Sequence, residues 1–191
     1  MRVAHFVSPN ITIEEWTSGR KTDIDVFEDQ LQGWVFDQAA ALCSLPRPAS
    51  DHSSHALLAL TAPYFEMITC YLEGQRTPNQ QATEFLRRGL HAVLGSQVPG
   101  AAIKKYVNEV RNGIAHELMF RTVILHRGVQ GLPTFGLHHD LGILVIDPFW
   151  LHDVVHAHFR SYVGRLRSPA TAEDREVVAK FNSFMSIKKA A

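Results

Sequence analysis

The sequence has only two cysteines among its 191 residues. Cys43 and Cys70 are far apart and form no CxxC pair, so neither a disulfide framework nor a cysteine zinc site is expected. Both lie in apolar stretches, where a free thiol packs as a small hydrophobic side chain. This cysteine usage is typical of a reducing compartment, and we expect a cytoplasmic protein.

Long apolar runs are also missing. No stretch approaches the roughly 18 apolar residues that a membrane-spanning helix requires. Residues 1–16 contain no sustained apolar segment and no cleavage-like ending, so no signal peptide is expected. We therefore expect no association with a membrane.

The chain carries no excess of charge, since 19 Lys and Arg residues balance 19 Asp and Glu residues. Nonspecific binding to nucleic acid through overall charge is not expected, because it requires many cationic contacts to phosphates. A local basic cleft is still compatible with this balance. Glycine-rich phosphate loops and the HExxH pattern are absent as well, and no cofactor is expected.

What the sequence does contain is helical periodicity along most of its length. A chain of this size can bury its own core, and we predict one domain over residues 1–191. Gly74 is placed to end a helix, and Pro63 to kink or restart one. Helices are expected over 22–44, 53–73, 77–95 (opened by Thr77 and Pro78), 100–118, 147–167 and 171–188.

Between the fourth and fifth of these ranges the periodicity changes. Residues 119–126 resemble a strand, 127–133 are rich in turn formers, and 134–138 with 142–146 return as strands. We predict a small β-hairpin inserted over about residues 119–146. The expected fold class is therefore mainly α: a helical bundle of about five or six helices with this small hairpin insertion.

The helix expected over 100–118 contains the segment Arg111-Asn112-Gly113-Ile114-Ala115-His116. Projected at about 100° per residue, its apolar residues form a stripe on one side of the helix. Arg111 lies at the border of that stripe, whereas Asn112 and His116 lie on the far side, one turn apart. Two interpretations remain for these three residues: ordinary solvated side chains, or one wall of a cleft.

The second interpretation has a clear chemistry. A histidine exchanges protons near neutral pH, and an arginine is a permanent cation that binds a phosphate through paired hydrogen bonds. An asparagine can donate to the phosphate or orient the histidine. These properties match metal-free cleavage of an RNA phosphodiester by its own 2′-hydroxyl, which requires acid–base help and stabilisation of charge.

The eight residues from Val110 to Glu117 resemble the R-N-x-x-x-H form of the signature of the HEPN superfamily. The resemblance implies a helical bundle that dimerises so that two motifs face one shared cleft. Catalytic members are metal-independent ribonucleases of toxin–antitoxin, antiviral and RNA-processing systems. It would make His116 the general acid/base, Arg111 the phosphate-holding residue and Asn112 their support, with RNA or a nucleotide, a second copy and an antitoxin-like protein as partners.

Two further residues are candidates for substrate binding. On the same helical projection Lys105 lies between Asn112 and His116, so it would extend a phosphate-binding strip. Glu66 stands among the apolar residues of an earlier helix. It is either a carboxylate on the polar edge of that helix or a partner for Arg111 or another cation across the bundle.

Eleven histidines raise the alternative of a metal-dependent hydrolase that uses the histidines of 138–158. His152 and His156 are four residues apart on an expected helix, as a metal pair would be, and His138, His139 and Asp140 precede them. No third ligand stands at a recognisable spacing, so we assign no metal ligand. A third alternative is a non-catalytic HEPN-like module that binds a nucleotide or a protein in a defence or stress system.

Overall fold

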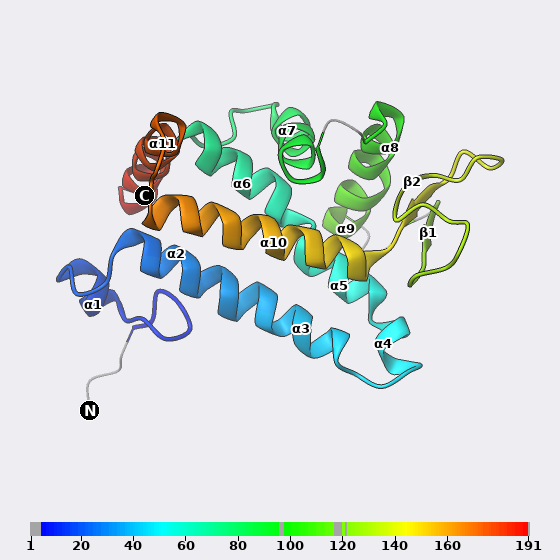
Figure 1. Cartoon of the computed structure of the whole chain (residues 1–191), viewed down its shortest axis with the longest axis horizontal. Helices are drawn as coiled ribbons and strands as arrows, with labels where there is room; N and C mark the ends of the chain where they lie inside the picture. The colour runs from blue at the N-terminus through cyan, green and yellow to red at the C-terminus, as the bar shows by residue number, and fades with distance from the viewer. Residues whose placement is uncertain (1–4, 96–97, 117–119, 121, 191) are drawn as a thin grey trace.

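The computed structural model describes residues 5–95, 98–116, 120 and 122–190, and of Ala115 and His116 it describes only the backbone. It is mainly helical, with one small three-stranded sheet. α10 (Pro148–Arg167) crosses the middle of the molecule, with α2 and α3 on one side of it and α6 on the other (Figure 1). Among the described helices, none combines the length and the apolar character needed to cross a bilayer.

The first helical region follows a short helix, α1 (Ile13–Thr17). It consists of α2 (Asp23–Leu31), the π-helical segment η1 (Gln32–Phe36) and α3 (Asp37–Cys43), without a break between them. Thr22 caps α2, because its side-chain oxygen accepts the backbone N–H of Asp25 while the Asp25 carboxylate accepts that of Thr22. The expected helix over 22–44 is confirmed, but the π segment within it was not predicted from the sequence.

Local signals also explain the second region. After the short α4 (Ala49–His52), α5 (Ser54–Thr61) ends and α6 (Pro63–Glu73) restarts with Pro63 in its first turn, where the missing N–H costs nothing. Gly74 ends α6 with φ of 70°, a left-handed conformation that favours glycine. Both predictions, the restart at Pro63 and the stop at Gly74, are confirmed.

The predicted start of the third helix was wrong. α7 (Ala82–Leu94) begins at Ala82, five residues after Thr77. Thr77 does not cap a helix, because its hydroxyl donates instead to the carboxylate of Glu66 on α6, at 3.1 Å. A contact between segments therefore replaces the local cap that the Thr-Pro pair suggested.

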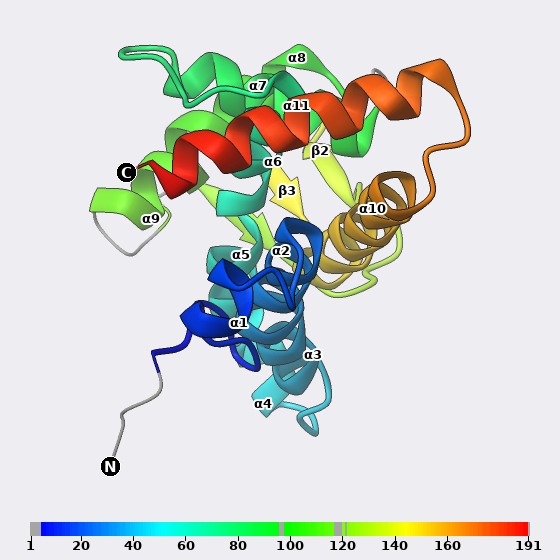
Figure 2. The ribbon, with the colours of Figure 1, turned by 90° about the vertical axis from the view of Figure 1, so that its left-hand side faces the viewer.

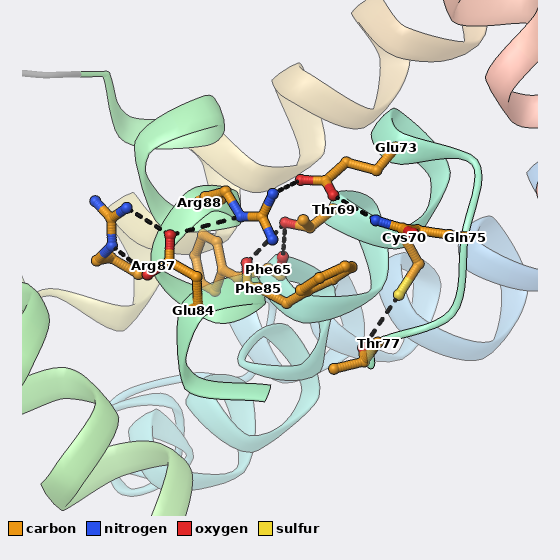
Figure 3. Close-up of polar contacts among 10 residues, drawn as sticks. All are labelled: Phe65, Thr69, Cys70, Glu73, Gln75, Thr77, Glu84, Phe85, Arg87 and Arg88. Atoms are coloured by element: carbon orange, nitrogen blue, oxygen red, sulfur yellow. Dashed lines mark hydrogen bonds and ion pairs between the residues drawn. The ribbon is translucent and has the colours of Figure 1, made fainter. Parts of the chain in front are cut away.

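α6 and α7 pack against each other at very short range. A Cβ on Gly89 would lie 1.7 Å from the carbonyl oxygen of Phe65, so only glycine allows this approach. The hydroxyl of Thr69 bridges the helices, 2.8 Å from the Phe85 carbonyl and 3.0 Å from that of Phe65 (Figure 3). At the edge of the interface Arg88 of α7 pairs with Glu73 of α6.

The helical run that carries the motif has three parts: α8 (Gly100–Lys105), the π-helical segment η2 (Tyr106–Arg111) and α9 (Asn112–His116). Ile103, Val107 and Val110, which belong to the apolar stripe expected on this helix, are buried. The predicted end of this helix, at residues 117 and 118, lies outside the described residues.

The sheet differs from the expected hairpin. It contains β1 (Val123–Leu125), β2 (Phe135–Leu137) and β3 (Leu144–Ile146) in the order β1-β3-β2. β2 and β3 form an antiparallel pair, but β1 pairs in parallel with β3 rather than with its neighbour in sequence. β1 and β3 have the same composition, one Val, one Ile and one Leu each, but all three residues of β3 are 0% exposed, so the most buried strand occupies the centre.

The last two helices start at side-chain caps. The carboxylate of Asp147 accepts the backbone N–H groups of Phe149 and Trp150 at the start of α10. Thr171 caps α11 (Ala172–Lys189) through a reciprocal pair with Asp174. α11 lies at the opposite end of the molecule from the sheet (Figure 1).

Aromatic rings make the centre of the core. Phe27 of α2 packs with Tyr71 of α6, Phe159 of α10 and Phe181 of α11, with ring centroids 4.5, 5.8 and 5.4 Å away respectively. One apolar cluster continues from these rings to β3. The sheet and the helices therefore share a core, which fixes the position of the motif helix against α6 and α7.

Candidate functional site

Arg111 is the last residue of the π segment η2, directly before α9. Its Nη1 donates to Oδ1 of Asn112 at 3.2 Å, and its Nη2 lies 3.9 Å from Oε2 of Glu66 on α6. The two ionic side chains are 35% and 29% exposed. Of the two interpretations of Glu66, the structure shows the ion pair with Arg111, as a loose contact at the surface.

Glu66 is itself held in place from a third segment. Its Oε1 accepts the hydroxyl of Thr77, and that hydroxyl oxygen lies 3.3 Å from Sγ of Cys70. Because a carboxylate only accepts, Thr77 donates to Glu66 and the Cys70 thiol donates to Thr77. The chain Cys70–Thr77–Glu66 fixes the carboxylate that faces Arg111. No sequence pattern indicated Thr77 for this role, since the contact joins segments eleven residues apart.

The described part of the site stops short of the histidine. Asn112 and His116 are the first and last residues of α9, one helical turn apart. The side chain of His116, the predicted acid/base, lies outside the described residues. The structure thus brings together Arg111, Asn112 and Glu66, and gives the backbone position of His116.

Lys105 is separated from Asn112 by the whole of η2. A π turn closes from residue i to i+5 and so holds about one residue more than an α turn. Residues beyond it are rotated by about 100° from the positions that a regular α-helix gives them. The projection that placed Lys105 and Asn112 on one face therefore does not apply through this segment.

The histidines of α10 are used in packing. Nδ1 of His158 lies 2.8 Å from the hydroxyl of Tyr64, and burial lowers the pKa of His158 to about 4. His156 stacks on Phe36, and burial lowers its pKa as well. His152 is buried, which has the same effect on its pKa. Burial thus favours the neutral form of each of these imidazoles.

A different group has the geometry of a metal site. The ligand atoms of His138, His139 and Asp140, in the turn after β2, all lie within 4.8 Å of one another. Nε2 of His139 is 3.0 Å from Oδ1 of Asp140. Within the described part of the chain, the histidines of α10 do not join this group. The set of 138–158 is therefore split between a surface turn and the core.

Comparison with protein-family models, with curated proteins and with solved structures gives no match to this chain.

Proposed function

We propose that the chain is a HEPN-like, RNA-directed protein, and that it is a metal-independent endoribonuclease using Arg111, Asn112 and His116. The observation that carries the proposal is the ordered Arg111–Asn112 pair at the start of α9, one helical turn before His116. In the reaction, His116 removes the proton of an RNA 2′-hydroxyl, whose oxygen then attacks the adjacent phosphorus. The bond to the 5′-oxygen breaks, and that oxygen takes a proton, from His116 of a second copy in a dimer.

The position of Glu66 supports a phosphate-binding role for Arg111. At 3.9 Å the carboxylate is too far for a hydrogen bond, so it orients the guanidinium without forming the paired N–H···O contacts that a phosphate would form. A phosphate can bind these donors and gain charge stabilisation as the negative charge grows in the transition state.

The π segment before the motif supports the same assignment. π turns within α-helices are rare and occur frequently at functional sites. η2 ends at Arg111, so the distortion includes the first of the proposed catalytic residues and directly precedes Asn112.

The test is cleavage of single-stranded RNA by the purified protein in the presence of a chelator. We expect products with 2′,3′-cyclic phosphate and 5′-hydroxyl ends, and loss of cleavage in His116→Ala. His139→Ala is the matched control, because His139 is an exposed histidine outside the motif. A wild type that cleaves no RNA, or a His116→Ala variant that cleaves as well, overturns the proposal.

The same experiment addresses the metal-dependent alternative. Its supporting observation is the His138–His139–Asp140 group. If an activity is lost on chelation and in His139→Ala, but survives in His116→Ala, the surface turn is the site and the ribonuclease proposal fails.

A further inference from the structure

A pocket of about 480 Å³ lies where α2, η1, α6 and α11 meet. Figure 2 views the molecule from the side on which α2 and α11 lie. The volume falls within the roughly 300–1,000 Å³ that is typical of small-molecule sites. The pocket is therefore large enough for a ligand with a flat apolar body.

The inner wall of the pocket is apolar. Phe27 is fully buried there, and Leu31, Met67 and Phe184 are partly buried. Trp34 stands at the rim and is 53% exposed, the most exposed tryptophan among the described residues. Trp34 belongs to the π segment η1, so each π segment of the described chain borders a candidate site.

Two cationic side chains, Arg76 and Lys188, complete the lining. Among the residues that the structure describes, neither forms an ion pair with a carboxylate. Arg76 donates to the backbone carbonyl of Ile187, and Nζ of Lys188 donates to the hydroxyl of Tyr71 at 3.0 Å. By contrast, the adjacent Lys189 pairs with Asp23 at 2.6 Å. The lining of the pocket contains no aspartate or glutamate among the described residues. The pocket therefore combines an apolar wall with two positive charges that no carboxylate of the described residues neutralises.

The state of Lys188 supports an anionic ligand. The residue as a whole is exposed, but neighbouring atoms displace water from its ammonium and thereby lower the pKa of Lys188. A bound anion would restore the charge stabilisation that water no longer supplies.

The pocket adjoins the candidate active site. Met67 in its wall follows Glu66 on α6, and Arg76 directly precedes Thr77. Glu66 and Thr77 are joined by their hydrogen bond, so the same two segments of the chain contribute to both sites.

A second pocket, of about 310 Å³ between α7 and α8, is lined by Arg87, His91 and Lys104 and has no Trp, Tyr or Phe among its described lining residues. Its Arg87 is already occupied by two hydrogen bonds from its side chain to the Glu84 carboxylate, at 2.8 and 2.6 Å. The first pocket therefore fits an anionic ligand with a flat body better.

We propose that the pocket at Trp34 binds a nucleoside phosphate, with the base stacked on Trp34 and the phosphate between Arg76 and Lys188. The ligand class rests on the proposed function, and the nucleotide is either free or part of single-stranded RNA. Stacking of bases on aromatic side chains beside a cationic track is the general mode of binding single strands.

The test uses the full chain carrying His116→Ala, so that RNA is bound without being cut. Binding of a labelled single-stranded oligonucleotide is measured by anisotropy, and binding of adenosine monophosphate by calorimetry. We expect Trp34→Ala to weaken binding about tenfold. Lys188→Met should weaken oligonucleotide binding and reduce the salt dependence by the equivalent of one phosphate contact, a change of about 0.7 in slope.

Arg175→Met is the matched control. Arg175 is exposed on α11 and does not line the pocket, so its removal changes the net charge by the same amount without touching the site. Its affinity should equal that of the parent. Circular dichroism melting of each variant separates loss of binding from loss of folding.

The outcomes distinguish this inference from the proposed function. Binding that depends on Trp34 supports the inference even if wild-type protein cleaves no RNA. Comparing the oligonucleotide with adenosine monophosphate shows whether the pocket binds single-stranded RNA or a free nucleotide. Cleavage by the wild type, with oligonucleotide affinity unchanged in Trp34→Ala, overturns the inference and leaves the ribonuclease proposal intact. If neither ligand binds and Trp34→Ala instead reduces the sedimentation mass, the pocket is a contact between copies and the inference is overturned.

Discussion

The hydroxyl of Tyr64 and Nδ1 of His158 lie 2.8 Å apart and join α6 to α10 across the core. Burial raises the pKa of Tyr64 well above its usual value, so the hydroxyl keeps its proton and either donates to Nδ1 or accepts from it, according to the tautomer of His158. Burial also lowers the pKa of His158 to about 4, so the imidazole is neutral at neutral pH. A second proton on His158 would place a charge inside the helical bundle, which makes the core sensitive to acid.

We predict that the protein loses stability as the pH falls from about 6.5 to about 4. The unfolded chain binds a proton at the ordinary histidine pKa of 6.5, whereas in the folded protein burial lowers the pKa of His158 to about 4. The stabilisation is therefore complete above pH 6.5, declines through this window and is gone below it. The loss from His158 is on the order of 2–3 kcal/mol.

Denaturant unfolding at a series of pH values measures this effect. His152 and His156, whose pKa values are lowered in the same direction, add to the slope. His158→Gln should therefore reduce the slope without abolishing it. An identical slope in the variant would show that His158 does not contribute.

A methyl group at the contact of α6 with α7 should be strongly destabilising. Gly89→Ala places a Cβ against the Phe65 carbonyl, and we expect a loss of about 3 kcal/mol or more in the free energy of unfolding. Gly164→Ala on α10 is the control, because beyond its chain neighbours and the nearby backbone of α10 no described atom lies within 4 Å of the place that its Cβ would take. It should gain about 0.5–1 kcal/mol from helix propensity. Equal melting temperatures for the two variants would contradict the close approach.

The Glu66–Arg111 pair should matter more for activity than for stability. Partly exposed ion pairs contribute about 0–1 kcal/mol, so Arg111→Lys should change the unfolding free energy by less than about 1 kcal/mol. RNA cleavage should nevertheless fall at least about tenfold, because lysine cannot form paired hydrogen bonds to a phosphate. Cleavage at the wild-type rate would remove Arg111 from the mechanism.

Removing the Asp147 carboxylate should destabilise the connection between the sheet and α10 and lower the free energy of unfolding. Its oxygens accept three backbone N–H groups, those of Gly128, Phe149 and Trp150, and the residue is buried. Asp147→Ala leaves these donors without an acceptor and should cost about 2–4 kcal/mol. Asp147→Asn keeps one acceptor oxygen and should cost less. Equal effects of the two substitutions on chemical denaturation would argue against the capping role.

The helices were predictable because their boundaries depend on local chemistry. Thr22, Pro63 and Gly74 act on the residues next to them, and the structure uses Pro63 and Gly74 as the sequence indicates. The predicted helix start at Thr77 failed because a carboxylate eleven residues away competes for its hydroxyl. The order of the strands failed for a similar reason. It depends on which strand the whole core buries, and β3 lies between both of the strands that precede it in the sequence.

The candidate site was predictable in part. Arg111 and Asn112 were candidates from the motif, and the structure places their side chains in contact; for Glu66, an ion pair with Arg111 or another cation was one of two interpretations. Thr77 and the pocket at Trp34 were not, since they are assembled from segments that are far apart in the sequence. The π segments carry no recognised signature, and they invalidate a regular helical projection wherever they occur.

The π segment η2 decides where along this helical run a deletion of one residue could be absorbed. Removing a single residue from Tyr106–Arg111 would let the segment close as a regular α-helix. Because a π turn holds about one residue more than an α turn, the residues on both sides of the deletion would keep their present orientation. The same deletion at a regular α-helical position of the run would instead rotate the residues after it by about 100° relative to those before it, and so separate the motif from the contacts that position it.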